Sequence, residues 1–102
     1  MATLQELTER VAQGVGADSG LGKSLKLNLR GEGVIHIEGG AVTNEDKDAD
    51  LVVSISRADL EALGRGQLDP MTAVISRRMQ LSDMGLAMSL QSKMQALFAR
   101  LT

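Results

Sequence analysis

The chain has 102 residues, which is the length of one domain. Its formal net charge is −2, from 11 basic and 13 acidic side chains, so no broad positive field would attract nucleic acid. Phe98 is its one aromatic residue, and the aromatic platforms that stack on single-stranded bases are therefore missing. These properties favour a single domain over residues 1–102 without a nucleic-acid partner.

The sequence contains no cysteine, which removes disulfides, thiolate zinc sites and cysteine nucleophiles and is compatible with a reducing compartment. Residues 1–15 have no basic start followed by an apolar run, so they do not resemble a secretion signal. No stretch approaches the ~20 apolar residues that span a bilayer. We therefore expect a cytoplasmic protein, and nothing in the sequence implies a cofactor.

The first half of the chain predicts one helix and four strands. Apolar residues at helical spacing behind a T-x-x-E capping box predict an amphipathic helix over residues 3–14. Alternating apolar and polar residues predict a half-buried strand over residues 25–30. Glycine-rich turns lead into strands at residues 34–37 and 41–43, which favours a three-stranded antiparallel meander. A polar loop precedes a further strand at residues 51–55.

The second half predicts three helices and one strand. Ser56 and Asp59 can cap a short helix. Asp69 and Pro70 begin another, because Asp accepts the free N–H groups of a first turn and Pro fits its first position. These two helices cross over to a last strand at residues 79–82. One continuous helix is expected from there nearly to the last residue.

Apolar residues occupy a wide arc of this last helix, about 200° when successive residues are spaced at helical intervals. Only Gln91 and Gln95 interrupt the arc. Packing against a core needs a stripe of only about 100°, so the excess apolar surface requires a second partner besides the sheet. The arc consists of Leu86, Leu97, Leu90, Leu101, Met94, Ala87, Phe98, Met84 and Met88.

Three segments of the second half carry a family resemblance: D-L-V-V-S-I-S at residues 50–56, Q-L-D-P-M-T-A at residues 67–73 and M-G-L-A-M-S-L-Q at residues 84–91. They are similar to the sterol carrier protein 2 family of sterol and lipid-transfer domains, with a dense match over residues 49–91. The resemblance implies an α+β fold with the element order α-β-β-β-β-α-α-β-α. It also implies a five-stranded, mainly antiparallel sheet that helices cover on one face.

The resemblance further implies a lipid-binding and lipid-transfer protein that is not an enzyme. In this family a hydrophobic tunnel between sheet and helices takes fatty acids, fatty acyl-CoA, phospholipids or sterols. The C-terminal helix and the helices before the last strand line or gate that tunnel. Carried onto this chain, the lipid-binding residues are Leu60, Leu63, Met71, Val74, Ile75, Met79, Leu81, Met84, Leu86, Met88 and Phe98.

Two departures from the family pattern affect the expected ligand and compartment. Val74 and Ile75 stand where relatives often carry aromatic residues, and Ser76-Arg77-Arg78 replaces a glycine-containing turn, which changes the expected shape of the tunnel. The chain also ends without the S-K-L type of peroxisomal address. We therefore do not expect a peroxisomal protein.

Two loop patterns resemble ligand sites but favour plain loops. A-D-S-G-L-G-K-S at residues 17–24 matches a relaxed phosphate-loop pattern, yet a helix precedes it and a strand follows, the reverse of what phosphate binding needs. Asp46, Asp48 and Asp50 imitate half of a calcium loop. The positions that require Gly and a bidentate Glu hold other residues, so we expect a solvated acidic loop and no metal site.

Functions of other classes stay open. The apolar arc could bury against a second copy of the chain, which would make a homodimeric interaction module, although we expect a monomer. An accessory domain of lipid-metabolising enzymes, or a small thioesterase, is a third hypothesis. His36, the one histidine, has no identifiable catalytic partner and is expected on the surface of the sheet. Arg77 and Arg78 are weak candidates for transient contact with a membrane surface.

Overall fold

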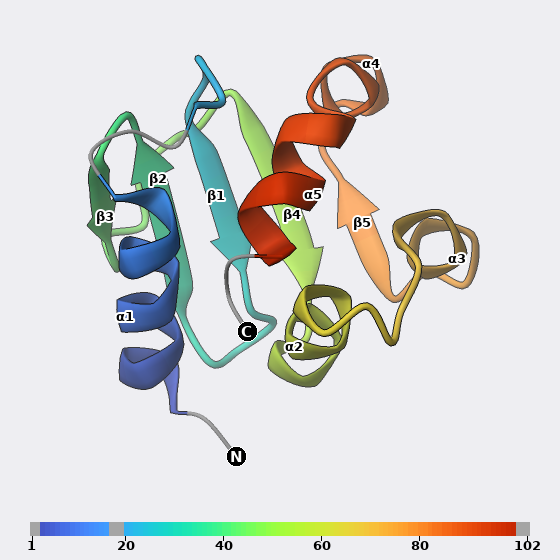
Figure 1. The fold of residues 1–102 in the computed structure, drawn as a ribbon, viewed down its shortest axis with the longest axis horizontal. Coiled ribbons are helices and arrows are strands. Elements are labelled where there is room, and N and C mark those ends of the chain that lie inside the picture. The colour runs from blue at the N-terminus through green and yellow to red at the C-terminus, as the bar shows by residue number, and fades with distance from the viewer. Residues whose placement is uncertain (1–2, 17–19, 100–102) are drawn as a thin grey trace.

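The computed structural model describes residues 3–16 and 20–99, and of Phe98 and Ala99 it describes the backbone (Figure 1). These residues form five strands and five helices. The strands are β1 (Leu25–Asn28), β2 (Val34–Glu38), β3 (Ala41–Thr43), β4 (Leu51–Ile55) and β5 (Met79–Leu81). The helices are α1 (Leu4–Val15), α2 (Arg57–Gly64), α3 (Pro70–Ile75), α4 (Met84–Ser89) and α5 (Gln91–Ala99).

The five strands form one sheet in the order β3-β2-β1-β4-β5. All neighbouring strands are antiparallel except β1 and β4, which run parallel. Leu25 of β1 therefore lies opposite Ile37 of β2 on one side and Leu51 of β4 on the other. The predicted α+β fold, with a mainly antiparallel sheet and a meander of the first three strands, is confirmed.

Helices α1, α2 and α5 lie on one face of the sheet, and the hydrophobic core forms between the two layers (Figure 1). Alternate residues of the central strands point into this core, so Leu27 and Val53 are completely buried. Helix α1 adds Leu7, Val11 and Val15, which the predicted amphipathic spacing places on its buried face. The core is thus formed by the apolar faces of the central strands and of the helices that cover them.

Side-chain caps fix the first turns of the two crossover helices. The Ser56 hydroxyl accepts a hydrogen bond of 3.1 Å from the Asp59 N–H, and the Asp69 carboxylate accepts one of 3.1 Å from the Thr72 N–H. Pro70 occupies the first turn of α3, where a missing N–H leaves no helical hydrogen bond unmade. Both predicted helix starts are confirmed, with Ser56 as the cap of α2.

The prediction of one continuous C-terminal helix is wrong, because the chain breaks at Leu90 into α4 and α5. Leu90 leaves helical geometry with φ −99° and ψ 3°, and its side chain is buried. Just before the break, the Leu86 carbonyl accepts both the Leu90 N–H at 3.0 Å and the Ser89 hydroxyl at 2.8 Å. Bonds of this kind from a serine side chain often bend helices. Figure 1 shows α5 across the sheet and α4 beyond the edge strand β5.

His36 is also not where we expected it, since it is only 3% exposed. It lies opposite Lys26 and Thr43 in the sheet register, on the face away from the core helices. The loop of residues 44–50 folds over that face, and the His36 Nε2 atom lies 3.1 Å from the Asp48 carbonyl oxygen. Strand periodicity predicted the correct face of the sheet but could not predict that a loop covers it.

Candidate functional site

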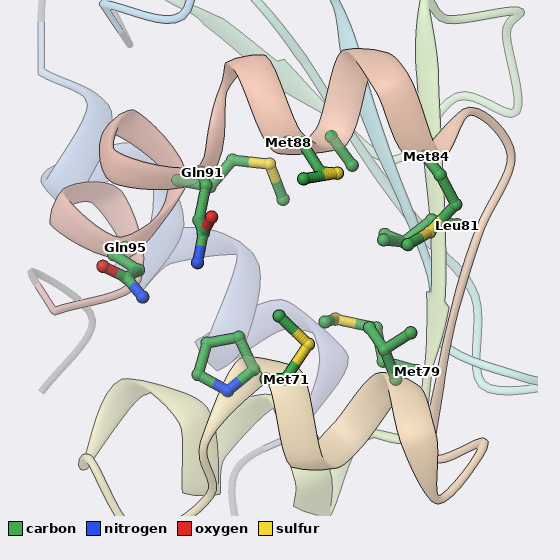
Figure 2. Close-up of a pocket in the computed structure, with 11 residues that line it drawn as sticks. Met71, Met79, Leu81, Met84, Met88, Gln91 and Gln95 are labelled. Carbon is green, nitrogen blue, oxygen red and sulfur yellow. The ribbon is translucent and has the colours of Figure 1, made fainter.

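An apolar groove lies at the β5 edge of the sheet, between α3 on one side and α4 with the start of α5 on the other (Figure 2). Its cavity has a volume of about 90 Å³, and the atom-free space reaches about 610 Å³ when the open solvent at its mouth is included. The groove is lined by Pro70, Met71, Val74, Met79, Leu81, Met84, Ala87, Met88, Gln91, Met94 and Gln95. Ligand sites commonly have volumes of about 300–1,000 Å³, so the cavity of this groove is smaller than a typical site.

Methionine dominates the lining. Five of the six methionines of the chain contribute to it. Met79 and Met94 are buried at its base, whereas Met71, Met84 and Met88 are exposed at its sides. An unbranched thioether side chain adapts to irregular partners, so this surface can fit apolar molecules of differing shape.

Helical spacing explains why these side chains converge. On α4, Met84 and Met88 are four residues apart and lie on the same face of the helix. On α3, Ala73 points into the core while Met71 and Val74 line the groove, and Ile75 points away into solvent. The groove therefore lies at the margin of the core, and Val74 contacts both.

One end of the groove is polar but uncharged. Gln91 and Gln95 are one turn apart on α5, and Figure 2 shows both amides at the end remote from Met79 and Leu81. Neither amide makes a hydrogen bond to any residue that the structure describes. Among the described lining residues none carries a charge.

Six of the eleven residues predicted to bind lipid line this groove. They are Met71, Val74, Met79, Leu81, Met84 and Met88. These six come from α3, β5 and α4, which lie next to one another at one edge of the fold.

The other five predicted residues lie elsewhere. Leu60 and Leu63 belong to α2 and are buried in the core. Leu86 of α4 packs against that core. Ile75 is 75% exposed and is not part of the lining. The side chain of Phe98 lies outside the described residues.

Sequence reasoning missed five lining residues: Pro70, Ala87, Gln91, Met94 and Gln95. Four of them belong to the wide apolar arc of the C-terminal segment or interrupt it. The position of the two glutamines within the apolar arc could have identified them as lining residues, because a polar residue in the arc faces the same side of the helix as its apolar neighbours.

The acidic loop does not gather its carboxylates into a metal site. Asp46 pairs with the Lys26 Nζ atom at 2.8 Å, while the Asp50 carboxylate accepts hydrogen bonds from the Ser24 N–H at 3.0 Å and the Ser24 hydroxyl at 3.1 Å. These two bonds, the backbone one first, hold the pKa of Asp50 below its usual value. No group of three or more His, Cys, Asp or Glu side chains within residues 3–16 and 20–99 could hold a metal ion.

The phosphate-loop-like segment connects α1 to β1. Its last residue, Ser24, binds Asp50 through both its backbone and its hydroxyl. Residues 17–19 of this segment lie outside the described residues. A helix precedes this loop and a strand follows it, as predicted, and phosphate binding would need the reverse order.

None of the helices in the described part of the chain has the length and apolar character required to cross a membrane.

Comparison with known proteins identifies the family. The model of the SCP-2 sterol transfer family matches residues 4–95. Sterol carrier protein 2 of Bos taurus is 38% identical over 56 residues, which are 54% of this chain and 10% of that protein. The chain thus spans about a tenth of the length of the curated relatives it matches.

Solved structures have the same fold. Sterol Carrier Protein 2 Like 2 from Aedes aegypti aligns with a TM-score of 0.73 and 22% identity, covering 87% of this chain and 94% of that one. The sterol carrier protein domain 2 of Helicoverpa armigera aligns with a TM-score of 0.62 and 24% identity, covering 92% and 76%. With the family match over residues 4–95, the chain belongs to the SCP-2 sterol transfer family.

Proposed function

We propose that this chain binds a lipid in the groove between α3 and α4 and transfers it between apolar environments. The observation that carries the proposal is an uncharged, methionine-lined groove in a member of a sterol transfer family. Each methylene moved from water into such a groove contributes about 0.8 kcal/mol. A membrane offers the lipid a similar apolar environment, so binding and release remain close to balance.

The exposed apolar residues support this site. Met71, Met84 and Met88 belong to the groove and, with Ile75, are the large hydrophobic residues that the described chain exposes. Contiguous apolar surface on a small domain usually marks an interaction site. A bound acyl chain or ring system would cover the three methionines and leave Ile75 in water.

The predicted hydrophobic tunnel would then be a property of the lipid-bound form. An empty tunnel of roughly 500 Å³ would cost about 12 kcal/mol, which is comparable to the whole stability of a domain. A groove that is narrow when empty avoids this cost. We therefore expect lipid to enter between α3 and α4 and to push these two helices apart.

We further propose a non-catalytic, monomeric carrier in the cytoplasm that contacts membranes transiently. The groove has no acid, base or nucleophile among its described lining residues that could hydrolyse an acyl group.

Native mass spectrometry of protein purified without added lipid tests the proposal. A co-purified species of lipid mass, one per chain, is the expected result. A lipid-free dimer would instead support the homodimeric interaction module. Turnover of an acyl-CoA by the purified protein, absent in the His36→Ala variant, would support the thioesterase hypothesis and overturn the carrier.

A matched pair of variants locates the site. Met88→Glu places a carboxylate in the groove, whereas Ile75→Glu places one on an exposed apolar residue outside the lining. Loss of co-purified lipid from Met88→Glu alone would support lipid binding in the groove. Equal loss or equal retention of lipid in both variants would contradict it.

A further inference from the structure

We infer that the groove selects lipids whose polar end is an uncharged hydroxyl and discriminates against ionised carboxylates. The inference rests on the proposed lipid-binding function and concerns which lipid class the same site accepts. Three features of the groove carry it: the two glutamine amides at one end, the lack of charge among the described lining residues, and the position of the described cations that are close to the lining in sequence.

The amides supply the chemistry that a hydroxyl requires. A glutamine side chain offers two N–H donors and a carbonyl acceptor, and a hydroxyl both donates and accepts. Gln91 and Gln95 reach the same end of the groove from successive turns of α5, and both are unpaired among the described residues. A hydroxyl placed between them could donate to one amide and accept from the other.

A carboxylate fits this end less well. It accepts hydrogen bonds only, so it could bond to the amide N–H groups but, unlike a hydroxyl, would leave both amide carbonyl oxygens without a donor. It would also lose part of its hydration at this end, where Gln91 and Gln95 are exposed, without gaining a positive charge among the described lining residues. The neutral end of a sterol, a fatty alcohol or a monoacylglycerol avoids both penalties.

Three of the described cations are close in sequence to lining residues, but none of the three lies beside the two amides. Lys93 lies midway between the two glutamines in sequence, which puts it on the opposite side of α5, and it is exposed. Arg77 and Arg78 are exposed and follow α3 immediately before Met79. Met79 lies at the end of the groove remote from the amides (Figure 2), so these arginines are not next to the glutamines.

Displacement of Nile red, an uncharged fluorescent probe, by 1-dodecanol and by dodecanoate at pH 8 tests the inference. The two lipids share one chain length and differ in the charge of the head. For the wild type we expect tighter binding of 1-dodecanol. In Gln95→Lys the ammonium would pair with the carboxylate, so the affinity for dodecanoate should rise about tenfold. The affinity for 1-dodecanol should fall, because an ammonium cannot accept the hydrogen bond that the hydroxyl donates to an amide oxygen.

Gln13→Lys is the matched control, because it adds the same charge on the exposed side of α1, outside the lining. Gln95→Lys should change the ratio of the two affinities, and Gln13→Lys should not. Binding of dodecanoate as tight as that of 1-dodecanol in the wild type would overturn the inference and leave the lipid-binding function standing. Equal ratios of the two affinities in Gln95→Lys and Gln13→Lys would also overturn the inference.

Two further outcomes are decisive. A selective loss of dodecanoate binding in Arg77→Gln would place the lipid head at the other end of the groove and overturn the inference. Displacement of Nile red by neither lipid would overturn the proposed function itself, and the inference with it.

Discussion

Met71 of α3 and Met88 of α4 face each other across the groove, and they are 57% and 67% exposed (Figure 2). Side chains of this size on a small domain normally pack against other residues. Here the two helices present their thioether ends to the same open space. A lipid between them would contact both and remove this apolar surface from water.

Substitution of Met88 by Glu should weaken lipid binding without unfolding the protein. Met88 makes few core contacts because most of it is exposed, whereas a lipid in the groove would lie against it. A carboxylate there must lose water when lipid binds, so we expect at least a tenfold loss of affinity, which corresponds to about 1.4 kcal/mol. Fluorescence titration with Nile red measures this loss.

Ile75→Glu is the control for that experiment. Ile75 is equally apolar and 75% exposed, but it points away from the groove. Its substitution should leave the affinity unchanged. A similar loss in both variants would mean that general surface polarity, rather than the groove, determines binding.

Leu60 should affect stability rather than ligand affinity, although the family resemblance places it in the tunnel. It is completely buried in the core under α2 and does not line the groove. Leu60→Ala should lower the free energy of unfolding by about 2–5 kcal/mol, measured by urea denaturation. A change of Nile red affinity in the folded variant, with little change in stability, would place Leu60 in the ligand site instead.

Asp50 should stabilise the loop before β4 in a pH-dependent way. Its pKa is lowered by the hydrogen bonds from Ser24, so the folded state binds the proton less tightly than the unfolded state does. The stabilisation is therefore fully present above the unfolded pKa of 3.8 and is lost as the pH falls through the lower folded value.

Urea midpoints of the wild type and Asp50→Ala measure this effect. The wild type should be more stable at pH 7, and the difference should shrink below pH 3.8. Asp48→Ala serves as the control, since the Asp48 side chain makes no hydrogen bond within the described residues. A difference between wild type and Asp50→Ala that is the same at both pH values would contradict this role.

Asp83 should stabilise the helix that carries Met84 and Met88. Its carboxylate accepts a hydrogen bond of 3.0 Å from the Leu86 N–H and so caps α4. Asp83→Ala should cost about 0.5–2 kcal/mol of unfolding free energy, and Asp83→Ser should restore most of it, because both Asp and Ser cap helices well. Equal stability of the Ala and Ser variants would show that the cap contributes little.

The sequence was sufficient for the elements whose local signals agree with their packing. The alternation from Leu25 to Leu29 gave the correct buried face of β1, and Asp69 with Pro70 marked the start of α3. Family resemblance supplied what periodicity cannot, namely the joining of all five strands into one sheet and the location of the site at α3, β5 and α4. The six lining residues that were predicted come from these three elements.

The remaining features depend on contacts distant in sequence. No proline or glycine next to Leu90 predicts the helix break, and the helical spacing of apolar residues continues through this position. Leu60 and Ile75 both have the apolar character of lining residues, yet one faces the core and the other faces solvent. Packing decides which apolar face of a short helix lies toward the groove. Residue type alone does not determine it.

Methyl NMR of protein with 13C-labelled methionine methyl and isoleucine δ-methyl groups tests the central claim most directly. Five methionines line the groove, so each reports on its own part of the site. On addition of one equivalent of 1-dodecanol, the methyl signals of Met71, Met79, Met84, Met88 and Met94 should shift, while the δ-methyl signal of Ile75 should not. Binding that leaves these five signals in place and moves methyl groups elsewhere would contradict a lipid site between α3 and α4.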